Sequence, residues 1–312
     1  MSDKNIVVLG CGYWGKNIIR NFSELGHLYG VADIDRSVSN SFSELYKVKD
    51  FTIKEALGND EIDAVAICTP AETHVSLALE AMKKGKHVFV EKPLALNIQD
   101  SKKLKKISND MNKKLMVGHL LQYHPAFEKV LNMIELGFIG NVKKIFSERM
   151  SFGKVRKHED VIWSFAPHDI SMVLAITKEL PTKVSCDGQQ IISNNLFDSA
   201  SINLSFNDIA AQIDVSWVHP VKRHCLTVIG EDGMIVFDDT KEWEEKVFYQ
   251  KYSLHKENEL IKGDHEYIKI EKKEPLRQEC KYFIDLLNGK KDSRTGADEG
   301  VQVVTVLCQL TA

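Results

Sequence analysis

The sequence lacks a long hydrophobic run, a cysteine framework and an excess of charge of either sign. No apolar stretch approaches the roughly 18 residues that a membrane-spanning helix needs. The chain also enters a strand-like segment almost at once, so we expect no signal peptide. The formal net charge is only -3, so no basic field indicates a nucleic-acid partner. The six cysteines are scattered without a CxxC pair, which is typical of reduced thiols rather than disulfides or a zinc site. These absences predict a cytoplasmic globular protein without a metal, nucleic-acid or membrane partner.

The 312 residues suffice for two domains, and the apolar rhythm of the chain changes near residue 120. Before that point, short and nearly continuous apolar runs alternate with helical segments, as in parallel strands that are buried on both faces. The runs lie at 5–10, 27–33, 62–68, 86–90 and 114–118. They predict an α/β architecture over residues 1–120, a doubly wound parallel sheet of the Rossmann type.

After residue 120 the alternation of apolar and polar residues is typical of half-buried strands. Residues 200–206 and 209–217 alternate across an Asn207-Asp208 turn and predict a hairpin. Further strands are expected near 141–150, 183–191, 223–230 and 233–237. Amphipathic helices are expected at 127–134 and, as the final helix, at 276–287. We therefore predict a second α/β domain over 121–312, with an open, mostly antiparallel sheet, whose last helices either stay with it or pack back on the first domain.

A glycine-rich turn follows the first expected strand and opens the helix expected over 16–25. Gly10 permits a tight turn, Gly12 lets the backbone approach a pyrophosphate, and Gly15 allows close helix–strand packing. Asp33 ends the second strand, where an acid accepts hydrogen bonds from ribose hydroxyls and repels a 2′-phosphate. NAD is therefore expected rather than NADP, although Arg36 nearby leaves that preference open. A turn without a ligand, with Asp33 as a helix cap, is the structural alternative.

Two later strand ends carry polar residues, Thr69-Pro70 and Glu91-Lys92-Pro93. The carboxyl ends of parallel strands meet at the ligand crevice of an open α/β sheet. Lys92 and Thr69 are therefore expected to face one crevice, with Glu91 orienting or balancing the amine. An ordinary surface ion pair is the alternative for Glu91 and Lys92.

A helix is expected to begin at Pro167, because proline suits the first helical turn. His168 and Asp169 then project from the start of this helix. Since a lone histidine is more often a surface or core residue, the pattern leaves His168 open between a catalytic and a structural role.

These motifs, taken together and in this order, resemble the Gfo/Idh/MocA oxidoreductases. The motifs are the glycine turn, Thr69-Pro70 with His74, Glu91-Lys92-Pro93 and His168-Asp169-Ile170. The resemblance implies a Rossmann domain, a C-terminal domain with a mostly antiparallel sheet, an NAD cofactor, and assembly into homodimers or homotetramers. It also implies that Lys92 is the active-site lysine and that His168 faces the substrate. Ser164 stands where many relatives carry an Asp, so a Lys-Asp-His relay lacks its carboxylate here.

The resemblance and the motifs together assign residues to two ligands. Those expected at the cofactor are Gly10, Gly12, Tyr13, Trp14, Gly15, Asp33, Arg36, Thr69, Pro70, His74, Glu91, Lys92 and Gln122. Those expected at the substrate are Lys92, Tyr123, His124, Arg156, Trp163, His168 and His219. The clusters Lys154, Arg156, Lys157 and Lys222, Arg223 could grip a pyrophosphate or be solvated loop charges.

Four segments, 119–127, 163–172, 216–220 and 237–239, resemble the nucleotide-sugar branch, the UDP-N-acetylglucosamine 3-dehydrogenases. This resemblance implies oxidation of the sugar 3-hydroxyl and a partner aminotransferase on a route to the 3-amino sugar of a surface glycolipid such as lipid A or lipopolysaccharide. A desolvated lysine beside a cationic nicotinamide favours the neutral amine, so Lys92 can accept the hydroxyl proton with His168 assisting. The alternatives are the uronic acid of the same sugar, a free sugar or an inositol as substrate, a hydrolase that uses NAD transiently, and a redox-silent NAD-binding sensor.

Overall fold

The computed structural model describes residues 4–156, 159–254 and 259–310. The chain divides into two compact units. The first unit comprises Met1–Leu120 and Glu274–Thr305, and the second comprises Leu121–Lys273 and Val306–Ala312. Each unit is described by itself below.

The sheet of the first unit is doubly wound and entirely parallel. Its order is β3-β2-β1-β4-β5-β6, and every neighbouring pair runs parallel. The strands are β1 (Ile6–Leu9), β2 (Leu28–Ala32), β3 (Lys49–Phe51), β4 (Ala64–Ile67), β5 (His87–Glu91) and β6 (Leu115–Gly118). The chain leaves β1 in one direction and returns to start β4 on its other side, so the strand order reverses between them, where such sheets bind ligands. The parallel Rossmann-type sheet is confirmed.

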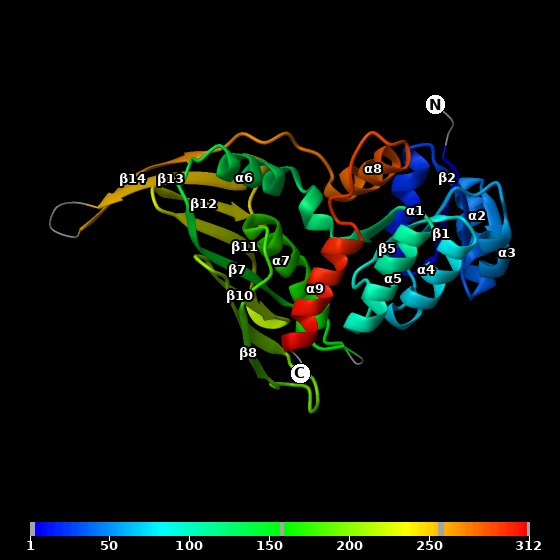
Figure 1. The fold of residues 1–312 in the computed structure, drawn as a ribbon, viewed down its shortest axis with the longest axis horizontal. Coiled ribbons are helices and arrows are strands. Elements are labelled where there is room, and N and C mark those ends of the chain that lie inside the picture. The colour runs from blue at the N-terminus through cyan, green and yellow to red at the C-terminus, as the bar shows by residue number, and fades with distance from the viewer. Residues whose placement is uncertain (1–3, 157–158, 255–258, 311–312) are drawn as a thin grey trace. The chain divides into compact units, whose positions relative to one another are not determined.

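Helices cover this sheet, and one of them arrives from far along the sequence. They are α1 (Gly15–Glu24), α2 (Arg36–Tyr46), α3 (Ile53–Gly58), the 3-10 turn η1 (Ala71–Thr73), α4 (His74–Lys83), α5 (Ile98–Asp110) and α8 (Pro275–Leu287). Helix α8 packs on α1 (Figure 1). Phe283 of α8 meets Phe22 of α1 and Phe89 of β5 edge-on, with ring centroids 6.3 and 5.7 Å apart. The apolar stripe of α8 is therefore buried in the core of the first unit.

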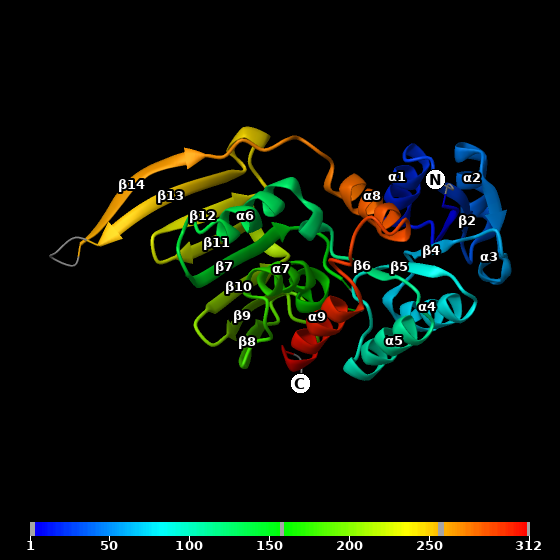
Figure 2. The same ribbon diagram turned by 45° about the horizontal axis from the view of Figure 1, so that its top comes forward.

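The second unit is built on an eight-stranded sheet in the order β14-β13-β12-β11-β7-β10-β9-β8. The strands are β7 (Val142–Phe152), β8 (Lys183–Gln189), β9 (Ser199–Ser205), β10 (Ala210–Ser216), β11 (Val218–Gly230), β12 (Gly233–Asp238), β13 (Val247–Leu254) and β14 (Leu260–Tyr267). Only β7 and β10 pair in parallel, so the expected mostly antiparallel sheet is confirmed. Helices α6 (Pro125–Glu135) and α7 (Val161–Thr177) lie over one of its faces (Figure 2). The 3-10 turns η2 (Leu120–Tyr123) and η3 (Trp243–Glu245) complete the short elements.

Two expectations about helices were wrong. Helix α7 begins at Val161, not at Pro167, because the Asp160 side chain caps it by accepting a hydrogen bond from Trp163 N at 3.0 Å. Pro167 lies inside the helix, where it leaves one backbone carbonyl without its usual donor. Residues 276–287 do not form the final helix either, since α9 (Ala297–Leu310) follows.

Candidate functional site

Two of the three glycines of the turn after β1 are required by the fold, and the third is not. Gly10 has φ of +94°, and a Cβ there would lie 2.8 Å from the backbone carbonyl of Cys68. A Cβ on Gly15 would overlap the carbonyl oxygen of Gly10. Gly12 has no positive φ, and a Cβ there would meet no atom within 4 Å. The fold thus requires Gly10 and Gly15, whereas Gly12 leaves open space above the backbone, as a bound pyrophosphate needs.

Asp33 holds the glycine turn to the start of α2. Its Oδ2 accepts a hydrogen bond from Cys11 N at 2.6 Å, and its Oδ1 accepts one from Asp35 N at 3.0 Å. A carboxylate offers about four acceptor sites, so Asp33 can still accept bonds from ribose hydroxyls. Arg36 does not pair with Asp33, because its guanidinium lies 2.8 Å from the Asp50 carboxylate.

Glu91 links the glycine turn to Lys92. The indole N–H of Trp14 donates a hydrogen bond to Glu91 Oε1, and the backbone N–H of Lys92 donates to Oε2 at 3.3 Å. Tyr13, by contrast, is 85% exposed. Glu91 is only 9% exposed, and burial raises its pKa to about 7 against the opposing effects of Trp14 and the Lys92 charge. Glu91 is therefore an enclosed carboxyl group tied to the turn, not half of a solvated surface pair.

His74 joins the chain segments that follow β4 and β5. Its side chain is 1% exposed, with Nδ1 2.8 Å from the carbonyl of Pro93 and Nε2 2.8 Å from that of Thr69. Burial lowers the pKa of His74, and a neutral ring carries one N–H, so one contact at a time is a hydrogen bond. Because both ring nitrogens face backbone carbonyls, His74 positions the Thr69-Pro70 and Lys92-Pro93 segments.

In the second unit, Gln122 and His124 are buried and engaged within that unit. Gln122 is 3% exposed and donates to Ser171 Oγ at 2.8 Å. His124 caps α6, lies 3.2 Å from Asp239 through Nε2, and stacks on Trp243 with ring centroids 5.5 Å apart. Tyr123 is 1% exposed. These buried side chains hold the start of α6 in place and do not line an open surface.

Helix α7 carries His168 and is anchored by its neighbour Asp169. Asp169 is fully buried and accepts hydrogen bonds from Arg149 Nε and Ser147 Oγ of β7, both at 2.6 Å. Ser164 is 4% exposed and lies one helical turn before His168, so the two share a helix face. The carboxylate of Asp169 is engaged in this structural pair.

The remaining expected substrate residues lie on more open parts of the second unit. Trp163 is half-buried on α7, and Arg156 is 3.7 Å from Glu159. His219 Nδ1 lies 2.6 Å from the carbonyl of Val221 on β11. Lys157 lies outside the described residues.

Two groups of the first unit escaped the sequence analysis. His119, 1% exposed, contacts the Glu299 carboxylate of α9 through Nδ1 at 2.7 Å. Glu279 is fully buried on α8. The sequence signal for Glu279 was a lone acid within an apolar helical stripe, which is unusual because a buried carboxylate is costly to desolvate.

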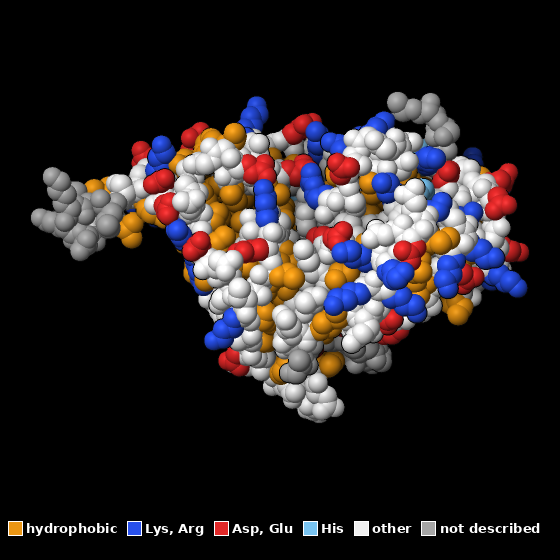
Figure 3. All heavy atoms as spheres, viewed as in Figure 1, with side chains coloured by type: hydrophobic (Ala, Val, Ile, Leu, Met, Phe, Trp, Pro, Cys, Tyr) orange, Lys and Arg blue, Asp and Glu red, His pale blue; other side chains and the backbone are white. Residues whose placement is uncertain are grey.

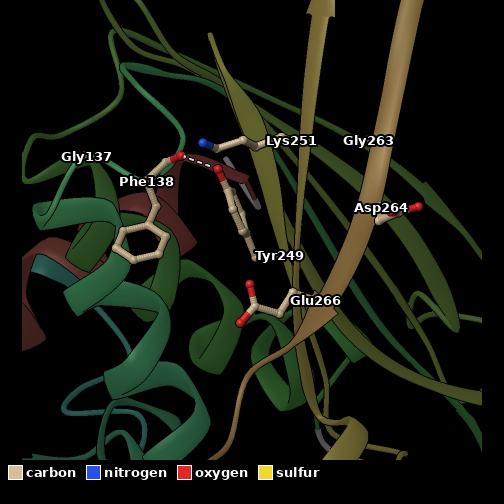
Figure 4. Close-up of a pocket in the computed structure, with 7 residues that line it drawn as sticks. All are labelled: Gly137, Phe138, Tyr249, Lys251, Gly263, Asp264 and Glu266. Carbon is tan, nitrogen blue, oxygen red and sulfur yellow. Dashed lines mark hydrogen bonds between the residues drawn. The ribbon is translucent and has the colours of Figure 1, made fainter.

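A cavity of about 700 Å³ in the second unit contains none of the residues that the sequence analysis assigned to a site (Figure 4). It is lined by Gly137, Phe138, Tyr249, Lys251, Gly263, Asp264 and Glu266.

Basic and acidic side chains intermingle on the face in Figure 3. Across the described ranges, no cluster of three His, Cys, Asp or Glu side chains is arranged to hold a metal, and no helix has the length and apolarity to span a membrane.

Comparison with known proteins covers both units. Residues 4–119 match the GFO_IDH_MocA family model, described as an oxidoreductase family with an NAD-binding Rossmann fold, and residues 127–236 match the GFO/IDH/MocA C-terminal domain. The chain is 28% identical over 202 residues to the UDP-N-acetylglucosamine 3-dehydrogenase of Acidithiobacillus ferrooxidans, covering 64% of this chain and 63% of that protein. It is 27% identical to the inositol 2-dehydrogenase of Rhizobium meliloti, with 63% of each covered. The matches thus span a little under two thirds of the length of these relatives.

Solved structures resemble the whole chain. A structure of UDP-N-acetylglucosamine 3-dehydrogenase GnnA from Acidithiobacillus ferrooxidans aligns with a TM-score of 0.89 at 22% identity, covering 99% of this chain and 97% of that one. GenD2 from gentamicin A biosynthesis, solved with NAD, aligns with a TM-score of 0.83 at 21% identity, covering 100% and 94%. At these identities the likeness establishes the fold.

Proposed function

Because the chain belongs to the GFO/IDH/MocA oxidoreductase family, we propose that it is an NAD-dependent dehydrogenase of a nucleotide sugar. The first candidate reaction is oxidation of the 3-hydroxyl of UDP-N-acetylglucosamine to the 3-keto sugar. The observation that carries the dehydrogenase proposal is Lys92, which follows β5 directly after a buried Glu91 that Trp14 ties to the glycine turn. The substrate proposal draws on the 28% identity to an enzyme of that name and on the sequence segments that resemble its branch.

The described residues suit NAD. Open space above Gly12 and remaining acceptor capacity on Asp33 match a pyrophosphate and a ribose with two hydroxyls. When bound, NAD accepts a hydride from the carbon that bears the hydroxyl. Tyr13 is proposed to contact the cofactor directly, whereas His74 contributes by holding the Thr69 and Pro93 segments.

We assign the proton chemistry to Lys92 and His168. From the family resemblance, Lys92 is proposed to accept the hydroxyl proton as the carbonyl forms, and His168 to assist it. Ser164 is not acidic, so the pair works without the carboxylate that a Lys-Asp-His relay would contain. The proposed residues for the sugar and pyrophosphate are Arg156, Trp163 and His219, while Tyr123 and His124 act by fixing the start of α6.

The setting of the proposed reaction follows from its product. A 3-keto sugar suits an aminotransferase as the next enzyme, on a route to a glycolipid. The proposal also includes a cytoplasmic location and a homodimer or homotetramer, with the second unit binding substrate and forming the subunit contacts.

The first test is the absorbance of NADH at 340 nm with a trap for the ketone. The panel is UDP-N-acetylglucosamine, its uronic acid, free N-acetylglucosamine and myo-inositol. NADH formed only with the first compound supports the full proposal. Turnover of inositol or the uronic acid would reassign the substrate, and inositol is a specific rival because of the similarity to an inositol 2-dehydrogenase. Absence of NADH across the panel with intact NAD binding would favour a sugar outside the panel or a redox-silent NAD-binding sensor.

Two lysine substitutions, one at Lys92 and one at a control position, test the catalytic assignment. Lys92→Ala should abolish turnover and leave NAD affinity within a few-fold of wild type, since a missing base removes the proton acceptor but not the turn. Lys103→Ala, at an exposed position on α5, is the matched control and should retain full activity. Full activity in Lys92→Ala would remove Lys92 from the mechanism.

A further inference from the structure

Glu279 is a carboxyl group enclosed in the core of the first unit. Its side chain is 0% exposed, and within the described residues no donor is hydrogen-bonded to either carboxyl oxygen. Its neighbours on the buried stripe of α8 are Leu276, Cys280 and Phe283. An isolated carboxylate in such surroundings is very costly, so Glu279 stays protonated and its hydroxyl needs an acceptor.

The packing of α8 on β5 brings Glu279 to Glu91. Phe283 contacts Phe89, at a centroid distance of 5.7 Å. Glu91 follows Phe89 by two residues, hence on the same strand face and about 6.6 Å further along. Glu279 precedes Phe283 by four residues, hence on the same helix face and about 6 Å away along the axis. The two spacings agree, so a helix that runs against the strand places both carboxyl groups at similar distances from the ring contact, on the same side of it.

Electrostatic interactions support this register. The negative charge of Glu91 raises the pKa of Glu279 beyond the effect of burial. Cys68, which directly follows β4 at the carboxyl edge of the sheet, has its pKa raised by burial and further by both Glu91 and Glu279. Glu279 therefore lies near the carboxyl edge of the sheet, where β5 ends.

We propose that Glu279 is a positioning residue whose protonated carboxyl donates a hydrogen bond to the Glu91 carboxylate and so keeps Glu91 charged beside Lys92. Glu91 then receives three donors: the Trp14 indole, the Lys92 amide and the Glu279 hydroxyl. Two acids so close can avoid mutual repulsion if only one is ionised. The effect on turnover rests on the proposed dehydrogenase function, whereas the hydrogen bond itself does not.

The surroundings of the pair favour a charged Glu91. Lys92 and His119 act on the Glu91 carboxyl, and both carboxyl groups act on the thiols of Cys68 and Cys280. Lys92 and His119 lower the pKa of Glu91. Burial raises the pKa of the Cys68 and Cys280 thiols, so they remain neutral near pH 7 and add no negative charge. A protonated Glu279 fits this balance, and an ionised one would oppose it.

Infrared spectroscopy of the full chain tests, without any substrate, whether Glu279 is protonated, as the proposed hydrogen bond requires. At pH 8, wild-type protein should show a protonated carboxylic-acid carbonyl band that disappears in Glu279→Gln. No such band in the wild type, or a band that persists in Glu279→Gln, overturns the proposal. Because this measurement needs no turnover, its outcome is independent of whether the proposed substrate is correct.

Turnover tests the positioning role with two variants of similar length. Glu279→Gln keeps a donor and should stay within twofold of wild type in kcat, with an unchanged pH profile. Glu279→Met lacks a donor, so the acid limb of kcat/KM should move up by about one pH unit. Equal shifts of the acid limb in both variants would mean that the lost acid group, and not the donor, causes the effect. No shift in either variant would mean that Glu279 serves only in packing. Each of these results overturns the proposal. Matching melting temperatures would exclude misfolding of the methionine variant as the cause.

Discussion

Replacing Gly12 by alanine separates ligand binding from folding more sharply than any other change in the glycine turn. A Cβ on Gly12 meets no atom of the protein within 4 Å, and its backbone has no positive φ. Gly12→Ala should therefore change the free energy of unfolding by no more than about 0.5 kcal/mol. The same methyl group occupies the space through which a pyrophosphate reaches the backbone, so NAD binding should weaken strongly.

The size of the loss follows from one hydrogen bond. A hydrogen bond between a backbone N–H and a charged phosphate contributes roughly 1.5–3 kcal/mol. Each 1.4 kcal/mol is about tenfold in affinity, so the Kd for NAD should rise on the order of 10- to 150-fold. Isothermal titration calorimetry gives the Kd, and urea denaturation gives the stability of the same sample.

Gly58 supplies the matched control within the same unit. It ends α3, and a Cβ there also meets no atom within 4 Å. Gly58→Ala should leave the Kd for NAD unchanged and be neutral or stabilising by up to about 1 kcal/mol. An unchanged Kd in Gly12→Ala, or an equal loss in both variants, would refute the assignment of the open space to the cofactor.

Three further perturbations test other parts of the structure. Asp33→Asn keeps the shape but removes the charge, so the ratio of NADP to NAD affinity should rise; an unchanged ratio would contradict the ribose assignment. Glu91 has its pKa raised to about 7, above its unfolded value of about 4.3, so its stabilising effect is full at low pH and is lost as pH rises through 7. Glu91→Gln should therefore flatten the fall in unfolding free energy between roughly pH 4 and 7 in urea titrations, and an unaltered slope would argue against the raised pKa. Arg149→Met leaves the buried Asp169 charge without its cation and should destabilise by about 3–5 kcal/mol, with Arg149→Met/Asp169→Asn recovering part of the loss in denaturation curves.

The sequence predicted those elements whose burial follows a simple period. The continuous apolar runs became β1, β2, β4, β5 and β6, and the alternating runs became the β9–β10 hairpin. The strand β3 escaped, because its three residues form no apolar run. The strand β14 escaped because all of its residues are exposed, so its pattern carries no burial signal.

The start of α7 was mispredicted because the prediction rested on Pro167 alone. Pro167 is typical of a first helical turn, whereas Asp160 is typical of the N-cap position. The structure follows Asp160, since the buried Asp169 holds the helix on β7 whatever the proline costs. The cap by Asp160 therefore sets the start of the helix, and Pro167 is accommodated within it.

Some features of the candidate site follow from the order of residues along the chain, and others arise only from the packing of distant segments. The glycine spacing and the position of Lys92 at a strand end are local, and the sequence located them. The surroundings of Glu91 are not local, because Trp14 comes from the turn after β1 and α8, from near the end of the chain, packs on the same strand. The contribution of Glu279 was out of reach until α8 was known to belong to the first unit.

Gly118 on β6 lies directly against the Glu91 carboxyl group. A Cβ on Gly118 would lie 3.1 Å from the Glu91 carboxyl carbon, tighter than nearly all side-chain contacts. The enclosed carboxyl therefore depends on a small residue at the adjacent position of β6 as well as on the Trp14 donor. Burial raises the pKa of Glu91, and it also prevents the carboxyl from turning away to solvent. The backbone N–H of Lys92 donates a hydrogen bond to this enclosed carboxyl group. The packing that raises the pKa of Glu91 therefore also restrains the backbone from which the Lys92 side chain extends.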